Sequence, residues 1–239
     1  MNHSPSPNPI ICALDTQEVA EATRMATLVR PHVGAVKLGL EFFTANGAAG
    51  VQAITQLDVP LFLDLKFHDI PNTVAKAIAA TAGMNMFMLT VHTSGGRAML
   101  RAAMDASDRV AQVTGKARPL VVGVTLLTSL DAADVAMVGF HDNLQDQVLR
   151  LADLAQSAGL DGVVCSPFEI APIRKACGGD FTLVVPGIRP EGSAAGDQKR
   201  ILTPKEALAR GADYLVIGRP ITGAENPAAA AQTIAEGLG

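Results

Sequence analysis

The amino-acid sequence predicts a single-domain (β/α)8 barrel, the TIM barrel of the α/β class. Eight short apolar segments alternate with longer segments in which apolar residues recur at helical spacing. The length of 239 residues is typical of one such barrel. A doubly wound sheet is the alternative, but no Gly-x-Gly-x-x-Gly turn follows the first apolar segment, where a dinucleotide-binding sheet would have one.

The predicted elements follow one another without an internal linker. Residues 1–9 are polar and rich in proline, so we expect a flexible N-terminal lead-in, followed by one catalytic domain over residues 10–239. The eight strands are expected at residues 10–14, 33–38, 61–65, 86–90, 120–124, 162–165, 182–185 and 214–217. The helices are expected at residues 18–29, 48–56, 69–82, 97–113, 144–158, 168–176, 203–210 and 228–238.

Composition argues against several classes of protein. The formal net charge is −4 and no basic segment is present, so nucleic acid is a poor candidate partner. No apolar run approaches the roughly 20 residues that span a bilayer, and the N-terminus lacks the pattern of a secretory signal. The three cysteines lack the close spacing of a zinc site. We therefore expect a cytoplasmic protein that binds neither nucleic acid nor a membrane.

Polar residues at the ends of the predicted strands are the candidates for function, because barrels carry their active sites at the C-terminal ends of their strands. These residues are Asp15, Lys37, Asp64, Lys66, His92, Thr125, Thr128, Arg189 and Arg219. His68 and His92 are interpreted as structural hydrogen-bonding residues beside the site rather than as acid–base catalysts.

Two lysines and three carboxylates are expected to meet there. Side chains alternate between the faces of a strand, so Asp64 and Lys66 share the inward face. Lys37 and Asp15 lie at equivalent heights on neighbouring strands, and Asp69 lies where the chain turns into a helix. Carboxylates favour the protonated form of a lysine between them, and that lysine can deliver a proton to a carbanion. The alternative is a network of structural ion pairs.

A phosphate site is also predicted. Residues 186–200 form a long, glycine-containing connection without apolar periodicity, as in binding loops and lids. Gly218 and Arg219 follow the eighth strand, which is a common location for phosphate binding in barrels.

The run Asp64-Leu65-Lys66-Phe67-His68-Asp69-Ile70-Pro71-Asn72-Thr73-Val74 resembles the central motif of the orotidine 5′-phosphate decarboxylase family. Shorter motifs in the expected order, which begin at residues 13, 36, 124, 186 and 217, extend the resemblance over nearly the whole chain. The resemblance implies a homodimeric lyase of pyrimidine biosynthesis that converts orotidine 5′-monophosphate into uridine 5′-monophosphate. It also implies that no cofactor or metal takes part.

The resemblance implies a role for each matching residue. Lys66 would protonate C6 of the pyrimidine, Asp64 would lie beside the departing carboxylate, and Lys37 would join the charge network and contact the ribose. Asp69 and Thr73 would reach the site of the neighbouring subunit, so that Asp69 belongs to the catalytic set. Further substrate contacts would come from Asp15 at the ribose, Thr128 at the pyrimidine, and Gln198, Arg219, Gly218 and Arg189 at the phosphate.

Two other functions are compatible with the same residues. A magnesium-dependent decarboxylase of sugar phosphates would also carry an Asp-x-Lys-x-x-Asp run, although the continuation from Phe67 to Thr73 favours the nucleotide enzyme. A catalytically inactive barrel that only binds nucleotides is the other alternative, and the intact set of lysines and carboxylates argues against it.

Overall fold

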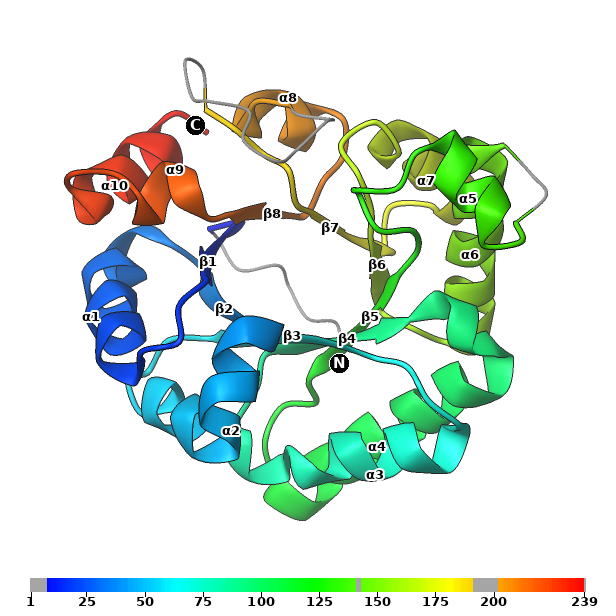
Figure 1. The fold of residues 1–239 in the computed structure, drawn as a ribbon, viewed down its shortest axis with the longest axis horizontal. Helices are drawn as coiled ribbons and strands as arrows, with labels where there is room; N and C mark the ends of the chain where they lie inside the picture. Colours follow the sequence, from blue (N-terminus) through cyan, green and yellow to red (C-terminus); the bar gives the residue numbers. More distant parts are fainter. Residues whose placement is uncertain (1–7, 141–142, 191–201, 239) are drawn as a thin grey trace.

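The computed structural model describes residues 8–140, 143–190 and 202–238, so that most of the predicted lead-in lies outside it. Eight parallel strands form a closed barrel in sequential order, and β8 pairs with β1. Helices surround this barrel (Figure 1). The strands are β1 (Ile10–Leu14), β2 (Ala35–Gly39), β3 (Leu61–Phe67), β4 (Met88–His92), β5 (Leu120–Val124), β6 (Gly162–Val164), β7 (Thr182–Val185) and β8 (Tyr214–Ile217). The predicted fold class is confirmed.

The long helices follow the strands as the periodicity predicts. The helices are α1 (Val19–Val29), α2 (Leu40–Thr55), α3 (Pro71–Ala80), α4 (Gly96–Thr114), α5 (Ala132–Met137), α6 (Leu144–Ala158), α7 (Ile170–Cys177), α8 (Pro204–Ala209), α9 (Arg219–Thr222) and α10 (Pro227–Glu236). The short helices α5 and α9 were not predicted. Within the described ranges, no helix is both long and apolar enough to cross a bilayer.

The barrel interior is apolar in its lower part and charged at its mouth. The inner core consists of Ile11, Ala13, Ala35, Phe62, Met88, Leu120, Val122, Val184, Tyr214 and Val216. Inward-facing residues recur at every second position of a strand. On β1, β2 and β3 the next inward position after this core brings Asp15, Lys37 and Asp64 to the mouth. The apolar core therefore closes the barrel beneath the charged residues.

Strand β3 departs from the regular strand that the sequence predicts. It extends to Phe67, and its pairing with β4 shifts register between Leu63 and Phe67. Within this bulge Lys66 has a φ of 52°, in the left-handed region that residues with a Cβ rarely adopt. Lys66 does line the cavity at the mouth, as predicted. The sequence analysis explained the inward orientation of Lys66 by the alternation of side chains along an extended strand. That explanation is wrong, because Lys66 lies in the bulge.

The opposite end of the barrel is held by ion pairs between elements. Asp161 precedes β6 and accepts hydrogen bonds from Arg118 Nη1 at 2.8 Å and from the backbone N–H of Val121 at 2.7 Å. Asp213 precedes β8 and accepts in the same way from Arg174 Nη2 at 2.6 Å and from the N–H of Leu183 at 2.7 Å. Each carboxylate thus links a guanidinium to the preceding strand.

Candidate active site

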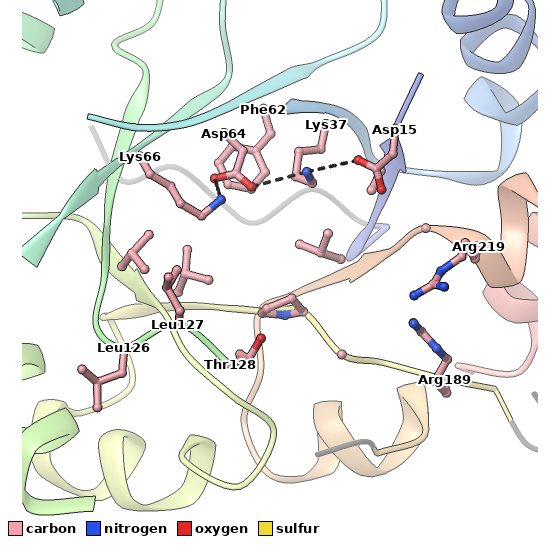
Figure 2. Close-up of a pocket in the computed structure, with 17 residues that line it drawn as sticks. Asp15, Lys37, Phe62, Asp64, Lys66, Leu126, Leu127, Thr128, Arg189 and Arg219 are labelled. Atoms are coloured by element: carbon pink, nitrogen blue, oxygen red, sulfur yellow. Dashed lines mark hydrogen bonds and ion pairs between the residues drawn. The ribbon is translucent and has the colours of Figure 1, made fainter. Parts of the chain in front are cut away.

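An open cavity of about 250 Å³ lies at the C-terminal ends of the strands. Its lining comes from the ends of all the strands except β4, and Figure 2 shows these residues. The lining residues are Ala13, Asp15, Lys37, Phe62, Asp64, Lys66, Val124, Leu126, Leu127, Thr128, Val164, Pro186, Gly187, Arg189, Val216, Gly218 and Arg219. One wall is charged, and much of the remainder is aliphatic.

The charged wall is a row in which lysine and aspartate side chains alternate. Lys66 Nζ lies 2.9 Å from Asp64 Oδ1, and Lys37 Nζ lies 3.4 Å from Asp64 Oδ2. Lys37 Nζ also lies 3.8 Å from Asp15 Oδ1, so the order along the wall is Lys66, Asp64, Lys37, Asp15 (Figure 2). Asp64 therefore uses one carboxylate oxygen for each lysine. The predicted meeting of these four side chains is confirmed.

The pairing of β2 with β3 explains this spacing. Gly39 at the end of β2 lies opposite Asp64, and a Cβ at Gly39 would lie 3.3 Å from Lys37 Nζ. The glycine leaves room for the ammonium group beside the carboxylate. On the other side of β2, Lys37 lies opposite Ala13 of β1, one inward step below Asp15.

Asp64 is held ionised although its side chain is only 13% exposed. Burial alone would raise the pKa of Asp64, but the charges of Lys37 and Lys66, with hydrogen bonds from Lys66 and Thr90, outweigh burial and lower it below 3.8. The wall therefore has a fixed negative charge between two ammonium groups. Such a preorganised array can stabilise charge that develops on a bound molecule and can provide a proton.

Thr90 is a residue of the site region that the sequence did not indicate. It lies on β4 and is fully buried. Its hydroxyl donates to Asp64 Oδ1 at 3.0 Å and accepts from the backbone N–H of Lys66 at 2.8 Å. The only available signal was a polar residue in an otherwise apolar strand, which is weak evidence for a role.

Two arginines face the cavity from the ends of β7 and β8. Figure 2 shows the guanidinium groups of Arg189 and Arg219 pointing toward one another on the Asp15 side of the cavity. Arg189 is buried, with 8% of its surface exposed. Two neighbouring positive charges repel each other, and an anion that is bound between them relieves this repulsion. This end of the cavity is suited to a phosphate or a carboxylate.

Most of the predicted site residues that the structure describes meet in this cavity, but Asp69 and Thr73 do not. Thr128 and Gly218 line it with the residues above. Asp69 and Thr73 are exposed at the start of α3 and do not line it, and the Asp69 carboxylate accepts the N–H of Ile70 at 2.7 Å. Gln198 lies outside the described residues, as does most of the predicted loop at 186–200.

The described residues contain no cluster of three or more His, Cys, Asp or Glu side chains that could hold a metal ion. The two carboxylates of the wall are separated by the ammonium group of Lys37. A cation placed between Asp15 and Asp64 would be repelled by this group.

Comparison with known proteins gives one consistent family. Residues 8–234 match the sequence model of the orotidine 5′-phosphate decarboxylase / HUMPS family. The orotidine 5′-phosphate decarboxylase of Paramagnetospirillum magneticum is 56% identical over 232 residues, which cover 97% of this chain and 99% of that protein. The enzyme of the same name from Rhodospirillum rubrum is 52% identical, with 95% and 93% covered.

A solved structure agrees with these relatives. The crystal structure of orotidine 5′-phosphate decarboxylase from Lactobacillus acidophilus is similar to this fold with a TM-score of 0.84 and 36% sequence identity, and the match covers 97% of this chain and 99% of that chain. An uncharacterized conserved protein from Geobacillus kaustophilus also shares the fold, with a TM-score of 0.83 and 35% identity over 97% of this chain and 100% of that chain.

Proposed function

This chain belongs to the orotidine 5′-phosphate decarboxylase family and catalyses the conversion of orotidine 5′-monophosphate to uridine 5′-monophosphate in pyrimidine biosynthesis, and we propose that the charged wall of the cavity carries out this reaction. The observation that supports the proposal is the row of Lys66, Asp64, Lys37 and Asp15 at the barrel mouth, opposite two arginines.

Lys66 is the proposed proton donor. When the bond between C6 and the carboxylate of the substrate breaks, carbon dioxide leaves and the electron pair remains on C6. The ammonium group of Lys66 then donates a proton to C6 to give the product. Support comes from the position of Nζ at the cavity wall, 2.9 Å from the Asp64 carboxylate.

Asp64 is proposed to lie beside the departing carboxylate of the substrate. Lys37 is proposed to provide the second positive charge of the site. Two like charges at close range destabilise bound substrate more than a transition state in which carboxylate charge is moving onto C6. The two ammonium groups act in the same direction, because they stabilise the developing carbanion. The buried, doubly paired position of Asp64 supports this division of roles.

The remainder of the nucleotide is proposed to extend along the cavity toward the arginines. Arg219, Arg189, Gln198 and the backbone N–H of Gly218 bind the phosphate in this proposal, Asp15 and Lys37 bind the ribose, and Thr128 contacts the pyrimidine. The distance between the charged wall and the arginine pair separates the reacting carbon from the phosphate. Binding energy from the phosphate can therefore support chemistry at C6.

We further propose a cytoplasmic homodimer in which Asp69 and Thr73 reach the neighbouring site. Both are exposed and outside the cavity of their own subunit, and the adjacent Ile70 is 66% exposed. Mixing inactive Lys66→Ala and Asp69→Ala chains should restore about a quarter of wild-type activity, because about half of all dimers then contain one chain of each kind and each of these has one intact site of its two. Activity that stays at background after subunit exchange contradicts the shared site.

The decisive experiment is ultraviolet-monitored turnover of orotidine 5′-monophosphate by purified protein, with and without a chelator. We expect full activity in both conditions. Loss of activity in chelator favours the magnesium-dependent decarboxylase of sugar phosphates instead. Thermal stabilisation by nucleotide without any turnover favours a barrel that only binds nucleotides.

A further inference from the structure

The bulge in β3 places a partly buried backbone group, the N–H of Lys66, opposite Thr90. Leu63 pairs with Leu89 and Phe67 pairs with Val91, so four steps along β3 are matched by only two along β4. Residue 90 is therefore the single β4 residue that faces the bulge. Bulged residues leave backbone groups without their usual ladder partners, and such groups need another partner when they are buried.

Thr90 satisfies this need with its side chain. Its hydroxyl oxygen accepts the backbone N–H of Lys66 at 2.8 Å, and its hydrogen is donated to Asp64 Oδ1 at 3.0 Å. Asp64 Oδ1 also accepts from Lys66 Nζ at 2.9 Å. The two nitrogens of Lys66, in the backbone and at the end of the side chain, are thus anchored to one hydrogen-bonded group.

This arrangement supports a conformation that lysine does not favour by itself. Lys66 has a φ of 52°, and such conformations persist only where the surroundings determine them. We propose that Thr90 is a positioning residue for catalysis, whose hydroxyl holds the bulged backbone of Lys66 and thereby aims the ammonium group at the reacting carbon. Thr90 does not line the cavity, so it acts through Lys66 and Asp64 and has no contact with substrate. The inference rests on the proposed role of Lys66 as proton donor.

The test compares three variants in which the size of a threonine is kept or nearly kept. Thr90→Val removes the hydroxyl, Thr90→Ser retains it, and Thr93→Val is the matched control. Thr93 is also fully buried, and its hydroxyl has no hydrogen-bond partner among the described residues. For each variant, kcat and KM for orotidine 5′-monophosphate and the affinity for uridine 5′-monophosphate are measured.

We expect Thr90→Val to lower kcat by about tenfold to a hundredfold, because small displacements of a reacting group have effects of this size. KM and product affinity should stay within about twofold, since the phosphate and ribose contacts are intact. Thr90→Ser should recover most of kcat, and Thr93→Val should match the wild type. A Thr90→Val enzyme that loses thermal stability but keeps wild-type kcat overturns the proposal.

Two further variants keep the outcome interpretable. If Thr90→Val does not fold, Thr90→Cys takes its place, because a thiol has similar size but is a weak donor and acceptor; wild-type kcat in that variant also overturns the proposal. Lys66→Ala separates the two levels of inference. If Lys66→Ala retains turnover, the proton-donor role fails, whereas an inactive Lys66→Ala with a fully active Thr90→Val contradicts only the role of Thr90.

Discussion

The two ends of the barrel use the same kinds of charged residue in different ways. At the base, Asp161 and Asp213 each bind one guanidinium and one backbone N–H at 2.5 to 2.8 Å. At the mouth, Asp64 is shared by two lysines. Lys37 Nζ lies 3.4 Å from Asp64 Oδ2 and 3.8 Å from Asp15 Oδ1. The ion pairs of Asp161 and Asp213 at the base are shorter than the ion pairs of Asp64 and Asp15 at the mouth.

This difference separates stability from function. A carboxylate that binds both an arginine and a strand N–H joins neighbouring elements of the barrel. A row of ammonium and carboxylate groups that borders an open cavity has charge to offer to a bound molecule. Changes at the mouth should therefore affect turnover, and changes at the base should affect unfolding.

The largest expected effect is that of Lys66→Ala. Removal of the proposed proton donor should lower kcat by at least about a thousandfold, within the range known for general acids that also carry charge. Calorimetry should still detect binding of uridine 5′-monophosphate, because the arginines are intact. Turnover close to that of the wild type would contradict the catalytic role of the mouth.

Arg219→Ala tests the other side of the cavity. Loss of a charge-assisted hydrogen bond to phosphate should raise KM for orotidine 5′-monophosphate by about tenfold to a hundredfold. The nucleoside orotidine, which lacks the phosphate, should be turned over as by the wild type. The exposed Arg101 of α4 provides the control, since Arg101→Ala removes an equal charge from a residue that does not line the cavity. Equal losses with nucleotide and nucleoside would argue against a phosphate site.

Asp213→Ala, at the base of the barrel, should lower stability and leave turnover unchanged. It removes the partner of Arg174 and of the Leu183 N–H, so the free energy of unfolding should fall by about 2 kcal/mol. Urea denaturation measures this loss, and Asp161→Ala should behave in the same way. The kcat of each folded variant should equal that of the wild type. A folded Asp213→Ala enzyme with reduced kcat would show that the two ends are coupled.

A smaller effect is expected from His92, which ends β4 beside the mouth. Burial lowers the pKa of His92 below 6.5, and the charges of His68 and Lys66 lower it further, while Asp64 opposes them. The unfolded chain therefore binds this proton first as pH falls, so His92 stabilises the fold above about pH 6.5 and this stability is lost below it. His92→Gln should reduce the drop in Tm between about pH 7.5 and pH 5.5. An unchanged drop would exclude His92 as its source.

Period-two patterns in the sequence were sufficient to predict much of the mouth. Asp15, Lys37 and Asp64 each lie one inward step above an apolar inner residue, and this depends only on local alternation. Thr90 could not be found in this way. Its role depends on which β4 residue faces the β3 bulge, and pairing between strands is not encoded in either strand alone.

The bounds of one strand and the two short helices α5 and α9 also differ from what the sequence predicted. The fourth strand was expected at residues 86–90 and lies at Met88–His92, because residues 86 and 87 are apolar but precede the paired segment. Helix α5 did carry a local signal, since Asp131 and Asp134 form a capping box at its start. Helix α9 has only the four residues from Arg219 to Thr222 and no apolar periodicity to detect.

The pairing of β8 with β1 determines when this chain can acquire activity during its synthesis. Asp15 follows the first strand and Gly218 follows the last, and a Cβ added at Gly218 would lie 3.7 Å from Asp15 Oδ2. The ribosome releases the first strand long before the last, so a nascent chain holds the charged wall without Arg219, which follows β8. Nucleotide affinity should appear only at the end of translation, when the ring of strands closes. Product binding is thus a direct reporter of completed folding.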